Sequence, residues 1–134
     1  YVSGMVSVLR YVAAQDVGKV INLNGCLGQI EGGIHHGLGF ALIEELEYES
    51  GFPLNPNFMG YKVLMASDMP EIGVVLVEDS DPDGGPFGAK GVGTPVMPAV
   101  APAVANAIAD AIGVRISELP ITPNKVMNVL ANDR

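Results

Sequence analysis

The sequence predicts a mixed α+β fold. Apolar residues recur at helical spacing over 28–47 and over two later segments, whereas residues 5–13 and 72–78 are rich in the β-branched types typical of strands. These segments alternate irregularly and lack the regular β-α-β order of a doubly wound parallel sheet. We therefore expect helices and small sheets packed together in one domain or in part of one.

The composition predicts more apolar surface than a small domain can bury alone. The chain has 134 residues, 49% of them hydrophobic, and 17 glycines in addition. Charged residues make up 16%, against roughly 25% in an average soluble domain. A domain of this size hides about two-thirds of its unfolded surface. We therefore expect other protein or a large ligand to cover part of this chain.

The charge and the single cysteine limit the classes of partner and compartment. A net charge of −8 argues against nucleic acid and anionic membrane surfaces, which require clustered Lys and Arg. Cys26 alone permits no intramolecular disulfide, and no signal-peptide pattern is present, so we expect a cytoplasmic protein. The uncharged stretch 91–109 is long enough to cross a membrane. Because three prolines interrupt it, we expect a buried helix and no membrane span.

The first third of the chain predicts strands followed by a long helix. Residues 5–13 predict a strand, and 19–22 a short second one, with a turn at Asp16-Val17-Gly18. Asn24-Gly25 is a further turn signal. The helix over 28–47 has its apolar stripe at Ile30, Ile34, Leu38, Ala41 and Leu42.

Four glycines lie inside this predicted helix, where each costs roughly 1 kcal/mol relative to alanine. They are Gly32, Gly33, Gly37 and Gly39. Such a pattern indicates that something approaches the helix backbone closely. A neighbouring helix or sheet is one candidate, and a flat bound cofactor is the other.

The middle of the chain predicts a hairpin and a buried strand. Residues 46–48 enter a turn at Ser50-Gly51, and residues 58–65 are the candidate return strand. A turn follows at 68–70. The nearly continuous apolar run over 72–78 is the clearest strand signal in the sequence.

The C-terminal part predicts two helices. Thr94-Pro95 is typical of an N-cap followed by proline at the first helical position. A regular helix is expected from about Ala101 to a C-terminal cap at Gly113. Residues 115–121 predict irregular structure or a short strand, and Thr122-Pro123 repeats the start signal for a last helix.

The glycine-rich loop over 80–93 is the first candidate for a ligand site. Its glycines let backbone N–H groups converge on an anion, and the helix start that follows adds a favourable dipole. It is not a Walker A loop, because Gly91 follows Lys90, and it lacks the dinucleotide order of glycines. A ligand-binding loop and an ordinary glycine-rich connection both fit the spacing.

Four other features carry chemistry less clearly. His35 and His36 are adjacent, so on a helix they do not share a face, and we expect a hydrogen-bonded or core histidine and no metal site. A thiol nucleophile at Cys26 would need a nearby histidine, and the sequence does not fix His35 or His36 beside it. Gln29 is either an exposed first-turn residue or an amide aimed at a heteroaromatic ligand. A cluster of four glutamates predicts a solvated helix end, at Glu44, Glu45, Glu47 and Glu49.

Several segments together resemble one family. They are residues 13–22, GQIEGGIHHGLGFALIEE at 28–45, GPFGAKGVG at 85–93 and LPITPNKV at 119–126. In this order they resemble the C-terminal part of the molybdopterin-binding subunit of the xanthine dehydrogenase and aldehyde oxidase family. The resemblance covers essentially the whole chain, so residues 1–134 are interpreted as the C-terminal part of a molybdopterin-binding domain.

The resemblance implies a molybdenum hydroxylase, which inserts a water-derived oxygen into a C–H bond of an aldehyde or N-heterocycle. The implied cofactor is molybdopterin, plain or as a dinucleotide, and iron–sulfur clusters and FAD are expected on partner chains or domains. Gln29 would hydrogen-bond the pterin beside Gly28. The loop of Lys90, Gly91, Val92 and Gly93 would pack beside the molybdenum centre.

Two departures from the family pattern affect this interpretation. The family loop normally ends in a glutamate that acts as general base, whereas this chain has Thr94. A threonine hydroxyl is no base near neutral pH, and loss of a positioned base typically costs 10²–10⁴-fold in rate. The chain is also short and lacks an initiator Met, so we expect a fragment or a separate small chain, with most cofactor contacts in a region outside it.

Three hypotheses therefore stay open. The first is part of an enzyme, active only with the remainder of its subunit, the iron–sulfur and FAD subunits and a small-molecule substrate. The second is a catalytically degenerate structural or assembly module, as Thr94 would allow. The third is a domain that uses the glycine loop for another phosphate-bearing ligand.

Overall fold

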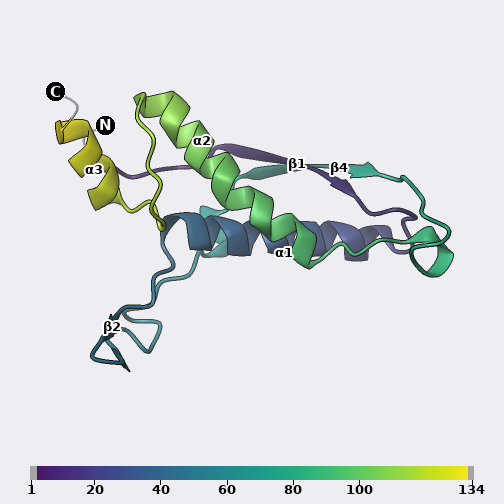
Figure 1. Cartoon of the computed structure of the whole chain (residues 1–134), viewed down its shortest axis with the longest axis horizontal. Coiled ribbons are helices and arrows are strands. Elements are labelled where there is room, and N and C mark those ends of the chain that lie inside the picture. The colour runs from purple at the N-terminus through teal and green to yellow at the C-terminus, as the bar shows by residue number, and fades with distance from the viewer. Residues whose placement is uncertain (1–2, 133–134) are drawn as a thin grey trace.

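The fold combines three α-helices with two small sheets over residues 3–132, the range that the computed structural model describes (Figure 1). This mixture confirms the predicted α+β class. The α-helices are α1 (Leu23–Leu42), α2 (Val100–Ile112) and α3 (Pro123–Asn132). The strands are β1 (Arg10–Asp16), β2 (Tyr48–Glu49), β3 (Phe52–Pro53) and β4 (Glu71–Val77). Short 3₁₀ helices are η1 (Ala66–Asp68), η2 (Pro86–Gly88) and η3 (Thr94–Ala99).

Helix α1 begins five residues earlier than predicted because Asn22 caps it. The Asn22 side chain accepts a hydrogen bond from the Gly25 N–H at 2.9 Å. The strand predicted at 19–22 and the turn predicted at Asn24-Gly25 are therefore wrong. The helix ends at Leu42 and not at 47, because the N–H groups of Ile43 and Glu44 both turn back to the Gly39 carbonyl.

Strands β1 and β4 form a parallel pair, in which Arg10 lies opposite Glu71 and Asp16 opposite Val77. The predicted strand over 72–78 is confirmed within one residue. The strand predicted at 5–13 is wrong at both ends, because the chain pairs with β4 only from Arg10, which lies opposite Glu71, as far as Asp16. One face of the pair packs on the core, whereas Val12 and Val75 on the other face are exposed.

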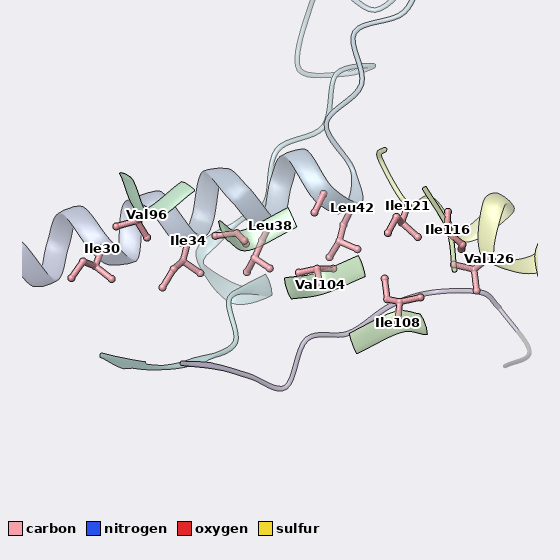
Figure 2. Close-up of a cluster of buried hydrophobic side chains, with 12 residues drawn as sticks. Ile30, Ile34, Leu38, Leu42, Val96, Val104, Ile108, Ile116, Ile121 and Val126 are labelled. Carbon is pink, nitrogen blue, oxygen red and sulfur yellow. The ribbon is translucent and has the colours of Figure 1, made fainter. Parts of the chain in front are cut away.

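The predicted apolar stripe of α1 is confirmed as the centre of the core. Figure 2 shows Ile30, Ile34, Leu38 and Leu42 in line along the helix, facing side chains of η3 and α2. Helix α2 ends at Gly113, whose φ of 80° is left-handed, as the sequence predicts. Thr122 accepts from the Lys125 N–H at the start of α3, which confirms the second Thr-Pro signal.

A hairpin arm over residues 44–62 hangs from the C-terminal end of α1 (Figure 1). Its return strand is Phe52–Pro53, so the return predicted at 58–65 is wrong. The four clustered glutamates lie beyond the helix and lead into this arm, so the predicted helix end is wrong as well. Tyr61 fastens the arm by donating its hydroxyl to Glu44 Oε2 at 2.8 Å.

Much of the arm is exposed and apolar, with Phe52 at 75%, Phe58 at 77% and Met59 at 86% exposure. This surface agrees with the apolar excess in the composition.

The segment Thr94–Ile112 is long and apolar enough to cross a membrane by length and composition alone. The core helix of a soluble protein passes the same test. Four of its side chains, those of Val96, Val100, Val104 and Ile108, belong to the core of residues 3–132.

Candidate functional site

The two glycine-rich segments meet at one end of the molecule, where α1 lies beside η3. A Cβ atom placed on Gly93 would lie 3.0 Å from Gln29 Oε1. One turn further along α1, a Cβ on Gly33 would lie 2.9 Å from the Val96 Cβ. The fold therefore brings the first turns of α1 and the end of the loop together, although the two segments are far apart in sequence.

Other glycines in the same region face open space. A Cβ atom at Gly28, Gly32 or Gly91 would have no other atom of the described residues within 4 Å, apart from the glycine itself, its chain neighbours and the adjacent helix backbone. Gln29 is exposed between the first two of these positions. Gly28 and Gly32, one turn apart on α1, therefore present uncovered backbone with the Gln29 amide beside them.

The loop also presents a run of backbone donors. Within residues 3–132, the N–H groups of Gly91, Val92 and Gly93 donate to no acceptor. The Val92 side chain is half-buried and packs against the core. Consecutive uncommitted N–H groups can bind anionic oxygens, and the Gln29 amide adds one acceptor and two donors. This arrangement is suited to a ligand that is polar, anionic and partly flat.

Lys90 fixes the loop to the end of β1. Lys90 Nζ pairs with Asp16 Oδ2 at 2.5 Å and approaches Asp79 Oδ2 at 3.8 Å. The Lys90 ammonium, together with the Gly18 N–H, holds the pKa of Asp16 below its ordinary value. The same carboxylate raises the pKa of Lys90. Sequence reasoning found Lys90 but missed Asp16, which it interpreted as part of a simple turn.

Thr94 is exposed and opens η3, directly after Gly93. The N-cap position belongs to Gly93 and the Thr94 side chain makes no capping bond, so the prediction of Thr94 as N-cap is wrong. The reason is that Gly93 is the last residue before the helical hydrogen bonds, since its carbonyl accepts from Val96. Thr94 thus lies one residue from the Gln29–Gly93 contact.

Among the residues described, the histidines and Cys26 show no arrangement for catalysis or metal binding. His35 Nε2 lies 3.0 Å from the Leu64 carbonyl, as expected for a hydrogen-bonded histidine. Cys26 is half-buried and not in a disulfide. Across the described part of the chain, no group of three His, Cys, Asp or Glu side chains is placed to hold a metal ion.

Comparison with known proteins identifies the family of the chain. The molybdopterin cofactor-binding domain family matches residues 2–70, which include β1, α1 and the arm. The chain belongs to this molybdopterin-binding family. The resemblance seen in the sequence is thereby confirmed.

Relatives and solved structures agree with the family. The aldehyde oxidoreductase molybdenum-binding subunit PaoC of Escherichia coli K12 is 35% identical over 96% of this chain. Subunit gamma of the 6-hydroxypseudooxynicotine dehydrogenase complex of Paenarthrobacter nicotinovorans is 40% identical over 90% of it. The aldehyde oxidoreductase from Desulfovibrio gigas superimposes with a TM-score of 0.89, at 34% identity over 97% of the chain.

The chain spans only a small part of these proteins. It covers 18% of PaoC, 16% of the gamma subunit and 14% of the Desulfovibrio gigas chain. The residues present nevertheless fit the family cofactor. Gly28 and Gly32 present open helix backbone that any Cβ would cover, and the Gln29 amide and loop N–H groups suit a pterin with anionic substituents.

Proposed function

We propose that this chain forms one wall of the molybdopterin pocket of a molybdenum hydroxylase, an oxidoreductase that hydroxylates an aldehyde or an N-heterocycle with water as oxygen source. The observation that carries the proposal is the meeting of Gln29 with Gly93 beside uncovered glycine backbone. Both segments are those in which the sequence resembles the family.

The chain's own residues have distinct roles in this proposal. When bound, the molybdenum cofactor supplies the redox chemistry, and the protein positions it. The Gln29 amide hydrogen-bonds the pterin, and Gly28 lets the ring system approach α1 closely. The N–H groups of Gly91, Val92 and Gly93 donate to anionic oxygens of the cofactor, whether it is plain or a dinucleotide.

Other parts of the enzyme complete the site. The proposed partners are the remainder of the molybdopterin-binding subunit, iron–sulfur and FAD subunits or domains, and a small-molecule substrate bound largely by residues outside this chain. The assembly is proposed to be cytoplasmic. The isolated chain is expected to be inactive, because it presents only one side of the cofactor pocket.

Thr94 supports a second candidate function, a catalytically degenerate module that serves assembly. Its exposed hydroxyl stands where the family resemblance implies a general base, and it cannot accept a proton near neutral pH. In that case the fold and the cradle persist without turnover. The two candidates differ in whether the intact complex holds cofactor and turns over.

The experiment compares three versions of the intact native complex: wild type, Gln29→Ala and Asn124→Ala. Asn124 is exposed on α3 and serves as the matched control for loss of a polar amide side chain. Molybdenum and pterin are measured per subunit. We expect full occupancy in wild type and in Asn124→Ala, and about tenfold weaker retention in Gln29→Ala.

Turnover with aldehydes and N-heterocycles then separates the two candidates. Cofactor with turnover supports the hydroxylase, and Thr94→Ala should then change the rate by less than about threefold, because the hydroxyl is not the base. Cofactor without turnover supports the degenerate module. A well-folded complex that never holds molybdenum or pterin contradicts both pocket roles.

A further inference from the structure

Residues 88–90 of the glycine loop are attached to the end of β1 and the turn after it, through backbone and side chain together. The Lys19 N–H donates to the Gly88 carbonyl and the Lys90 N–H donates to the Val17 carbonyl, both at 2.9 Å. Gly18 sits between them at a φ of +59°, and a Cβ there would collide with the Gly88 carbonyl oxygen. This close approach requires glycine at position 18.

The side-chain attachment lies on the same short segment. Asp16 accepts from the Gly18 N–H through Oδ1 and from Lys90 Nζ through Oδ2. The Lys90 and Asp16 side chains are partly buried, with exposures of 33% and 37%. One carboxylate therefore holds both the turn after β1 and the lysine of the loop.

This attachment lies three residues before the contact with Gln29. From Lys90 the chain runs through Gly91 and Val92 to Gly93, whose Cβ position is 3.0 Å from Gln29 Oε1. A Cβ at Gly91 would meet no atom of the described residues within 4 Å apart from its own residue and its chain neighbours, so Gly91 itself makes no packing contact on that side. The 91–93 backbone is held in the middle by Val92, which packs against the core, and at its two ends by the Asp16–Lys90 pair and the start of η3.

We propose that Asp16 and Lys90 are positioning residues that hold the 91–93 backbone ready for the cofactor. The inference rests on the proposed function, because it assigns the loop N–H groups to cofactor binding. Lys90 then acts through the backbone that it fixes, with its ammonium committed to Asp16 and, more distantly, to Asp79. An ordered loop binds more tightly because less conformational entropy is lost on binding.

The test uses the intact complex with Asp16→Asn, Lys90→Met and Lys90→Arg. Asparagine retains the acceptor for Gly18 and removes only the charge facing Lys90, so it leaves the turn in place. The matched control is Lys125→Met, which removes the ion pair between Lys125 of α3 and Glu118, at 3.2 Å, together with a hydrogen bond to the Leu119 carbonyl. Two quantities are measured: the rate of molybdenum and pterin release on dilution, and hydrogen exchange over 86–93.

We expect Asp16→Asn and Lys90→Met to release cofactor about tenfold faster and to exchange faster over 86–93. Lys90→Arg should retain most of the wild-type behaviour, and Lys125→Met all of it. Faster release in Lys90→Met alone would overturn the proposal, because it would indicate direct contact between the lysine and the cofactor. Unchanged hydrogen exchange over 86–93 in Asp16→Asn and Lys90→Met would also overturn it. The exchange measurement stays decisive even if the wild-type complex proves to hold no cofactor.

Discussion

Gly37 offers a quantitative test of the packing that brings the two halves of the site together. A Cβ at Gly37 would collide with Val100 Cβ and would lie 2.7 Å from Val100 Cγ2. Such a contact is overpacking, which typically costs about 1–3 kcal/mol, and alanine regains only about 1 kcal/mol of helix propensity. At the upper end of that range, Gly37→Ala should lower the local stability of α1 by about 2 kcal/mol.

The sign of this effect should depend on Val100. Removal of its side chain in Val100→Gly costs about 3 kcal/mol on its own, through lost burial and helix propensity. It also removes the atoms that the new methyl group would meet most closely. Gly37→Ala in that background should therefore stabilise by about 1 kcal/mol.

The assay is hydrogen exchange of α1 amides in the full-length subunit, which reports the local free energy of opening. The double-mutant cycle compares four proteins, which are wild type, Gly37→Ala, Val100→Gly and the double variant. If Gly37→Ala destabilises α1 equally in both backgrounds, helix contact does not explain this glycine and the packing argument fails.

Three further predictions follow from local contacts. Asn22→Ala removes the cap of α1 and should destabilise its first turn by about 1 kcal/mol, visible as faster amide exchange over 23–27. The pKa of Asp16 is held below its ordinary value, so the stabilisation from ionised Asp16 is complete above about pH 4 and is lost as the pH falls through the folded pKa. Hydrogen exchange over 86–93, corrected for intrinsic rates, should therefore rise at low pH in wild type but not in Asp16→Asn. Tyr61→Phe removes the bond to Glu44 Oε2 and should expose the arm over 44–62 to faster limited proteolysis, with Tyr48→Phe as the unchanged control.

Periodicity predicted the core of this fold well. The stripe of α1 and the strand over 72–78 were found because burial imposes a spacing that sequence alone displays. The ends of the elements were predicted less well, because they depend on partners that are distant in sequence or on how the chain turns. Arg10 begins β1 only because Glu71 lies opposite, and Leu42 ends α1 because two N–H groups return to Gly39.

The candidate site divides in the same way. The residue types at Gln29 and in the glycine loop were visible in the sequence, and their joint order carried the family resemblance. The role of Asp16 was not visible, because its partner Lys90 lies 74 residues further along the chain. A turn motif next to a strand gives no sign that its carboxylate reaches a distant loop.

The glycines of α1 show how one pattern can serve two purposes. Gly33 and Gly37 face Val96 and Val100, so a neighbouring helical segment explains them without a ligand. Gly28 and Gly32 lie one turn apart, and no atom of residues 3–132 covers their Cβ positions, so helix packing within that range cannot explain them. Each still costs roughly 1 kcal/mol of helix propensity. No packing contact compensates for this cost at Gly28 and Gly32, which lie beside Gln29, where a bound cofactor would need bare backbone. Gly28 and Gly32, and not Gly33 and Gly37, are therefore the glycines that indicate a ligand.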